Sequence, residues 1–272
     1  KNWNWSVGFN LSHNKNMLRK TYNGEDLNDK VLGRPVYGIY TFKDEGIVQK
    51  EEDIPMYLNA SGKQIPLYFQ SINNPLRVGG RKIKDQNYDG VIDDKDLYYA
   101  GSTLPAVYGG LNSHLEWKGL SFDVLFSYTI SRKVMNMYKN SAFTFTKDFG
   151  VIMNYFHAGD FWTTSNRDAK YPSLEFADKD YVGQFDGNVD SNIENISFLR
   201  LKQLVIGYQI PKNWLKGSFI KDANVYLSGE NLFLLTNYSG VDPEIINPYS
   251  GKDDGTQYPL NRKVTLGLNL KF

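Results

Sequence analysis

The residues best suited to chemistry in this chain form an acidic segment at positions 85–96, DQNYDGVIDDKD. Side-chain oxygens fall at loop positions one, three, five, nine and twelve, a glycine falls at position six, and a backbone carbonyl is available at position seven. This is the spacing of an EF-hand-type calcium loop, in which oxygens surround a hard cation and the glycine permits a sharp turn. The spacing predicts calcium ligands at Asp85, Asn87, Asp89, Asp96 and the carbonyl of Val91.

Two features of the acidic segment leave another interpretation open. Position twelve is Asp96 rather than the usual bidentate Glu, and neither flank has a helical pattern, so the segment would be a loop of the dockerin kind at most. The alternative is a solvated acidic turn in which Asp and Gly serve the local backbone geometry. Calcium that stiffens this loop is therefore a hypothesis.

The chain offers no catalytic constellation. The three histidines, His13, His114 and His157, are isolated, and no HExxH, GxSxG, P-loop or GxGxxG motif is present. The adjacent carboxylates Asp253 and Asp254 lie in loop-like sequence. We therefore expect a protein that is not an enzyme.

The composition excludes several classes of protein. The 272 residues carry 31 basic and 30 acidic side chains, without a basic stripe, so nucleic acid is not an expected partner. Cysteine is absent, which rules out disulfides and thiolate metal sites. No run of 18 apolar residues could form a transmembrane helix, but aromatic residues reach 15%, and these favour strands and membrane interfaces.

Strict alternation of apolar and polar residues predicts two-faced strands. In the final segment, RKVTLGLNLKF, every second residue from Val264 to Phe272 is apolar, and residues 1–12, 107–117 and 120–130 follow the same period. A two-residue loop at 118–119 predicts a hairpin whose pairs place all its apolar side chains on one surface: Trp117 with Leu120, Leu115 with Phe122, and Leu111 with Phe126.

Less regular patterns predict three more strands, at 34–42, 197–210 and 223–235, with a bulge near Gln203. The connections of this seven-strand set alternate in length, with long ones at 43–105, 131–196 and 236–261 and shorter ones at 12–33, 118–119 and 211–222. A soluble β-sandwich has no reason to sort its loops in this way. The pattern is typical of an all-β, transmembrane, antiparallel up-and-down β-barrel with short periplasmic turns and long extracellular loops. Phe272 at the periplasmic rim would make the first strand run toward the periplasm.

The long loops are rich in aromatic and amide side chains, which suit the faces of sugars or peptide chains. Mutual packing of the loops, or a rim of interfacial rings, is the alternative. The residues concerned are Asn154, Tyr155, Phe156, Phe161, Trp162, Tyr171, Phe176, Tyr238, Tyr249 and Tyr258.

Several longer stretches resemble SusC/RagA-type TonB-dependent transporters. The stretches SNIENISFLRLKQLVIGYQIPKNWL (191–215), DANVYLSGENLFLLTNYSGVDPEI (222–245) and YPLNRKVTLGLNLKF (258–272) look like the C-terminal end of that family. GRPVYGIYTFKDEGIVQKEEDI (33–54), the acidic segment and GSTLPAVYGGLNSHLEWKGLSFDVLFSY (101–128) are similar to it in content and order.

The resemblance implies that residues 1–272 are the C-terminal portion of a 22-strand barrel in the bacterial outer membrane, with residues 43–105 as a long extracellular loop. It also implies a plug domain and a TonB box, absent from these residues and expected upstream of them. The implied partners are a SusD-like surface lipoprotein, the TonB complex, outer-membrane lipid, and an oligosaccharide or peptide that is imported. A calcium-stiffened cell-surface binding or scaffold barrel without active transport is the alternative function.

Overall fold

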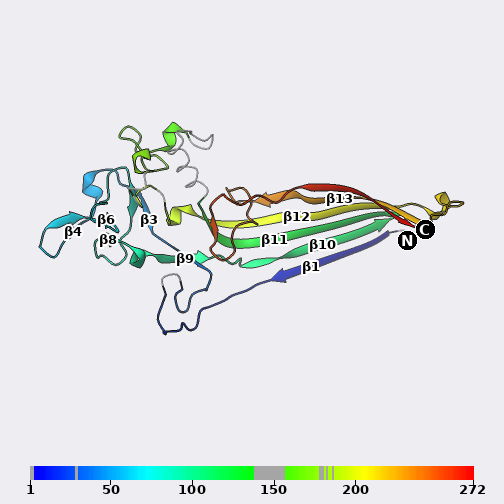
Figure 1. The fold of residues 1–272 in the computed structure, drawn as a ribbon, viewed down its shortest axis with the longest axis horizontal. Helices are drawn as coiled ribbons and strands as arrows, with labels where there is room; N and C mark the ends of the chain where they lie inside the picture. The colour runs from blue at the N-terminus through cyan, green and yellow to red at the C-terminus, as the bar shows by residue number, and fades with distance from the viewer. Residues whose placement is uncertain (1–2, 28–29, 138–156, 178–180, 182, 186) are drawn as a thin grey trace.

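A computed structural model describes residues 3–27, 30–137, 157–177, 181, 183–185 and 187–272. Six long strands form one antiparallel sheet, in which each strand lies beside its neighbour in the order β1-β10-β11-β12-β13-β15 (Figure 1). Both chain termini lie at one end of this sheet, and the loop structure gathers at the other. The strands are β1 (Trp3–Ser12), β10 (Val107–Trp117), β11 (Leu120–Asn136), β12 (Ile193–Gln209), β13 (Asp222–Thr236) and β15 (Lys263–Lys271).

The hairpin between β10 and β11 has the register that the sequence predicts. Trp117 faces Leu120, Leu115 faces Phe122, and Leu111 faces Phe126. Lys118 and Gly119 in the turn have φ angles of +50° and +87°, as a tight two-residue hairpin loop requires. The predicted bulge is also confirmed, because the pairing of β12 with both of its neighbours skips Lys202.

The predicted wall strand at 34–42 is wrong. Only Gly38–Thr41 (β2) is a strand there, and it pairs with β9 (Tyr98–Ser102) in the loop structure, while β1 pairs directly with β10. The partial alternation in this segment arises because Ile39 and Thr41 are buried among the loops. Residues 13–106 are therefore a single connection, which starts well before position 43.

This correction reverses the direction of the first strand but keeps the sorting of the loops. The long connections 13–106, 137–192 and 237–262 all leave one end of the sheet, and the turns at 118–119 and 210–221 join strands at the other. The strand β1 therefore runs toward the long-connection end, whereas β15 runs away from it. The predicted placement of all long loops on one side is confirmed.

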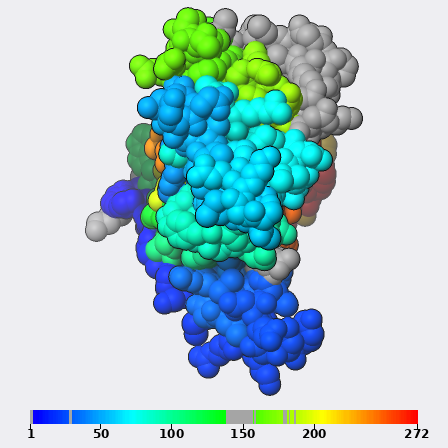
Figure 2. Space-filling model, turned by 90° about the vertical axis from the view of Figure 1, so that its left-hand side faces the viewer, coloured from blue at the N-terminus to red at the C-terminus, as the bar shows by residue number. Residues whose placement is uncertain are grey.

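The first long connection folds around a hydrophobic core of its own. Figure 2 shows its blue and cyan surface covering much of the long-connection end. The core residues are Val48, Ile54, Leu67, Phe69, Leu76, Ile83 and Ile92, with Val189 added by the second connection. The short strands here are β3 (Asp44–Ile47), β4 (Met56–Leu58), β5 (Gln64–Pro66), β6 (Tyr68–Phe69), β7 (Arg81–Ile83) and β8 (Val91–Ile92), and β14 (Lys252–Asp253) extends the edge of β11.

Single turns of 3₁₀ helix are the helical elements in the described part of the chain. They are η1 (Glu51–Asp53), η2 (Asp94–Asp96), η3 (Ala158–Asp160), η4 (Leu174–Ala177), η6 (Asp190–Asn192) and η7 (Lys212–Trp214). No helix among these residues is long and apolar enough to cross a membrane.

Candidate functional site: a two-faced wall and its loop end

One face of the six-strand sheet, here called the apolar face, presents large hydrophobic side chains to the surroundings. Leu266 is 75% exposed and Val264 is 67% exposed, although both lie within the regular pairing of β13 and β15. Surfaces of this kind are rare on soluble monomers and suit the hydrocarbon of a bilayer. Further exposed members of the apolar face are Trp3, Trp5, Val7, Phe9, Leu11, Trp117, Leu227, Leu235, Leu268 and Leu270.

The opposite side of the sheet, the polar face, carries charged and amide side chains. His114 on β10 lies directly across from Asp123 on β11, and its Nδ1 is 2.6 Å from an Asp123 carboxylate oxygen. Its Nε2 is 3.3 Å from Glu116. These contacts give His114 a structural role in a polar cluster. A face with this chemistry suits the water-filled interior of a barrel.

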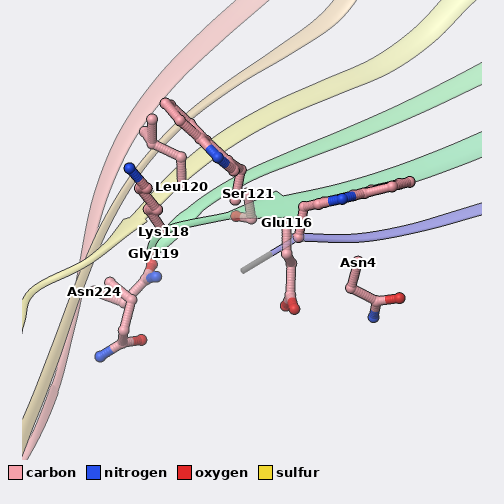
Figure 3. A pocket seen from close by; sticks show the side chains of 10 residues that line it. Asn4, Glu116, Lys118, Gly119, Leu120, Ser121 and Asn224 are labelled. Carbon is pink, nitrogen blue, oxygen red and sulfur yellow. The ribbon is translucent and has the colours of Figure 1, made fainter. Parts of the chain in front are cut away.

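A hollow of about 480 Å³ lies at the short-turn end, where β1, β10, β11, β12 and β13 converge. In Figure 3, Asn4 and Glu116 hang from the same side of the sheet, and Leu120 points away from them. Gln209 and Asn224 complete the polar lining. The hollow therefore offers hydrogen-bonding groups, which fit another polypeptide segment or water better than an apolar ligand.

Aromatic rings gather at the same end. Phe219 in the turn between β12 and β13 stacks on the terminal Phe272, with ring centroids 5.6 Å apart, and the Lys221 ammonium donates to the Phe272 carbonyl. Trp214 in the same turn and Trp117 at the end of β10 are also exposed. Rings at the end of an apolar wall are typical of the interfacial girdle of membrane barrels.

The third long connection folds back onto the polar face as a strap, defined here as residues 242–247. Arg200 of β12 is 2% exposed, and its guanidinium lies 2.5 Å from Asp242 and 2.6 Å from Glu244. Lys202 forms a second ion pair with Glu244. Asp242 also accepts backbone N–H bonds from Glu244 and Leu260. The buried Arg200 and Asp242 thus have opposite charges beside them, and the Asp242 carboxylate is hydrogen-bonded, as a low-dielectric site requires.

A second anchor holds the strap through carbonyl groups. The buried Arg132 guanidinium of β11 donates to the carbonyls of Ile246 and Asn247, at 3.2 and 3.3 Å, and to that of Thr103 at 2.9 Å. Sequence reasoning missed both anchors. The available signal was the pair of cations in FLRLK, since Arg200 and Lys202 are the basic residues of this strand and lie beside the predicted bulge.

The first and second long connections are joined at Asp190. Its carboxylate accepts from Lys43 Nζ at 2.7 Å, from the Asp44 N–H at 2.9 Å and from the Tyr98 hydroxyl at 2.6 Å. Burial alone would raise the pKa of Asp190, but the bonds from Lys43 and Tyr98 outweigh it and lower this pKa below its ordinary value. The nearby Arg81–Asp44 ion pair, at 2.5 Å, is almost fully buried.

Hydrogen bonds from backbone N–H groups to Asp side chains order the acidic segment. Asp85 accepts from the N–H groups of Tyr88 and Gly90, at 2.7 and 2.9 Å. Asp96 is fully buried and accepts from Gln86 and Asp93, at 2.7 and 2.9 Å. These bonds supply the turn geometry that the alternative interpretation expects.

The other predicted metal ligands also bond within the segment. Asn87 and Asp89 exchange hydrogen bonds, and Val91 donates its N–H to Asp89 at 3.0 Å. Burial and the Asp85 carboxylate together raise the pKa of Tyr57 to about 12. Across the described residues, no group of three or more Asp, Glu or His side chains is arranged to hold a metal ion. Calcium at this segment stays a prediction.

The predicted loop aromatics divide between packing and exposure. Phe161, Tyr171 and Phe176 form a buried cluster with Phe185, which supports mutual packing of the loops. Trp162, the residue after Phe161, is also buried. Asn154, Tyr155 and Phe156 lie outside the described residues. Tyr238 is buried and donates to Asp253, whereas Tyr249 and Tyr258 are exposed.

The remaining histidines have local contacts. His13 Nδ1 lies 2.5 Å from the Ala106 carbonyl, where the first long connection begins and ends. The ring of His157 faces Asp160 at 3.6 Å. His13 thus joins the two ends of the first long connection.

A sheet that is apolar on one face and polar on the other, with all long connections at one end, defines part of the wall of a transmembrane antiparallel β-barrel. Comparison with known proteins identifies the type of barrel. The chain is 30% identical to TonB-dependent receptor P26 of Formosa agariphila and 26% identical to TonB-dependent receptor SusC of Bacteroides thetaiotaomicron, with all of the chain aligned in both cases. It covers 27% and 25% of those proteins. No protein-family model matches the chain.

Solved structures agree on the fold. The chain superposes over its whole length on "Structure of the RagAB peptide transporter" with a TM-score of 0.67 at 23% identity, and covers 28% of that chain. The open-open state of the RagAB peptide importer gives a TM-score of 0.65 at 25% identity, with 27% of that chain covered. The resemblance to SusC/RagA-type TonB-dependent transporters that the sequence indicates is therefore confirmed over the whole chain. The chain spans about a quarter of the length of these relatives.

Proposed function

We propose that this chain forms part of the wall and the extracellular chamber of a bacterial outer-membrane importer that draws its energy through TonB. The observation that carries the proposal is the sorted, two-faced wall: an apolar face for lipid, a polar face for the interior, and every long connection at one end. In this proposal the end with Phe272 is periplasmic and the loop end is extracellular. The similarity to TonB-dependent receptors and to the RagAB structures supports it.

The proposal includes the parts of the protein that these residues do not supply. The described sheet has unpaired edges at β1 and β15, and such edges are not stable in lipid, so further strands would close the barrel. The resemblance to SusC/RagA-type transporters implies 22 strands in all. A plug domain and a TonB box would lie in the rest of the polypeptide. A SusD-like lipoprotein would be the extracellular partner, and an oligosaccharide or a peptide would be the cargo.

Uptake by the intact protein tests the proposal. The full-length gene would be restored to a deletion strain, and growth on candidate oligosaccharides and peptides as the carbon source would be measured with and without TonB. We expect growth that needs both this protein and TonB. Uptake that persists without TonB would refute active import and favour the alternative, a cell-surface binding or scaffold barrel stiffened by calcium.

A further inference from the structure

A hollow of about 470 Å³ lies where all three long connections meet. Its volume is in the range of small-molecule binding sites. The first connection supplies most of the lining, the second supplies Asn188, and the third supplies Tyr249, Ser250 and Lys252. Because three separate segments build it, the hollow is shaped by the folded loops as a group. The lining residues used below are Tyr37, Tyr40, Asp94, Asn188, Tyr249 and Lys252.

Tyrosine rings provide flat surfaces at this hollow. Tyr37 and Tyr249 lie with centroids 5.1 Å apart and planes tilted by 59°. Tyr40 rests against Tyr99, at 5.7 Å, which fixes the orientation of its ring. Tyr249 is 65% exposed although a neighbouring ring supports it. A supported, exposed ring is suited to stacking against the apolar face of another ring.

Two charged side chains of the lining, Asp94 and Lys252, are exposed and are able to form hydrogen bonds and ion pairs with a ligand. Within the part of the chain that the structure describes, neither the Asp94 carboxylate nor the Lys252 ammonium forms an ion pair or a side-chain hydrogen bond. Asp94 differs in this respect from Asp85 and Asp96 of the same acidic segment, whose oxygens are occupied by backbone N–H groups. A carboxylate that accepts and an ammonium that donates can together bind a molecule with several hydroxyl groups.

The backbone around the hollow is already paired, which disfavours a peptide bound as an added strand. The Tyr37 carbonyl accepts from the Thr103 N–H at 3.1 Å, and the Tyr40 carbonyl accepts from Asn188 Nδ2 at 2.8 Å. Phe42 donates its N–H to the Asn188 carbonyl at 2.8 Å. Strand β2 thus has β9 on one side and residues 188–190 on the other. Strand addition needs a free edge, so side chains must make the contacts here.

We infer that this three-loop hollow is a saccharide-binding site. A sugar ring would stack on Tyr249, and its hydroxyl groups would donate to Asp94 and accept from Lys252. The inference rests on the proposed function and narrows it: the cargo, or the part of it captured first, is a carbohydrate rather than a peptide.

Binding to purified protein tests the site. The probes are a printed array of neutral and acidic oligosaccharides and a pool of tryptic casein peptides, applied to the full-length protein in detergent. We expect oligosaccharides to bind, and calorimetry with the strongest binder on the array to show a tenfold or larger loss of affinity for Tyr249→Ala and for Asp94→Ala. Tyr258→Ala is the control, because Tyr258 is an exposed tyrosine of the same connection, 81% exposed against 65% for Tyr249, but lies outside the lining. Its affinity should be unchanged.

Several results would overturn the site: no oligosaccharide on the array binds, the casein peptides bind instead, or Tyr249→Ala binds as tightly as the unaltered protein. Cellular uptake separates these outcomes from failure of the proposed function. If Tyr249→Ala leaves TonB-dependent uptake intact, the saccharide site is wrong and import stands. If uptake by the unaltered protein does not need TonB, import is wrong whatever the hollow binds.

Discussion

The buried Arg200 is expected to hold the strap on the polar face, and its removal should release that segment. Arg200→Met keeps the length of the side chain but removes both short ion pairs to Asp242 and Glu244. Asp242, which is also 2% exposed, would then keep its charge with only backbone N–H donors in place of a cation. Removing one partner of a buried pair costs about 3–5 kcal/mol, because the other charge stays desolvated.

Lys202→Met provides the comparison. Lys202 and Glu244 are each more than a quarter exposed at their side chains, and pairs of this kind contribute roughly 0–1 kcal/mol. The two cations are neighbours on one strand and share Glu244, so the two variants differ mainly in burial and in the loss of the Asp242 contact. The effect of Arg200→Met should exceed that of Lys202→Met by several kcal/mol.

Hydrogen exchange of the full-length protein measures the difference locally. The N–H groups of Glu244 and Leu260 are bonded to the Asp242 carboxylate, so they report whether the strap is closed. In Arg200→Met we expect exchange in this segment to accelerate by about a hundredfold or more, which corresponds to roughly 3 kcal/mol. In Lys202→Met it should change by less than about tenfold. Equal exchange rates in the two variants would refute the assignment of Arg200 as the main anchor.

Three further outcomes follow from the structure. Leu266→Arg on the apolar face should cost about 2–4 kcal/mol in the stability of the protein in lipid vesicles, and Asn269→Arg on the polar face of the same strand should cost little; equal costs would contradict the assignment of the faces. Asp190 has a lowered pKa in the fold, so its contribution is present above its ordinary value of 3.8 and is lost as the pH falls through the lower folded value. Pepsin cleavage of the first two connections should therefore rise below about pH 4, and Asp190→Asn should remove this pH dependence. Calorimetry should detect calcium uptake that Asp89→Ala abolishes, and the absence of uptake by the unaltered protein would show that the acidic segment is only a turn.

The wall could be predicted from the sequence because its geometry is local and periodic. Alternation with a period of two assigns each side chain to a face, and the two-residue turn at 118–119 then leaves one register that keeps Leu111 and Phe126 on the same surface. The long connections are sorted to one end by the same up-and-down order. These conclusions need no knowledge of contacts between distant segments.

The loop end could not be predicted, because its contacts join residues far apart in the chain. The broken alternation of residues 34–42 predicts a wall strand, but it reflects burial of Ile39 beneath neighbouring loops. Asp190 meets Lys43 across 147 positions, and Gln184, fully buried, bonds to Asn74 across 110. No periodic signal marks a polar contact of this kind. The composition of the long loops indicated only that aromatic rings were available, and most of those described proved to be packed.

The bulge at Lys202 lies where the wall, which the sequence predicts, meets the strap, which it does not predict. Before it, Leu199 and Leu201 face the apolar side, and after it the even-numbered residues from Leu204 do so. The extra residue keeps Leu199 and Leu201 on the same apolar face as Leu204 and Ile206 although the chain changes phase between them. Arg200 points to the polar face just before the bulge, and Lys202 in the bulge also reaches Glu244. The irregularity that the alternation reveals is therefore the point where the wall binds the strap.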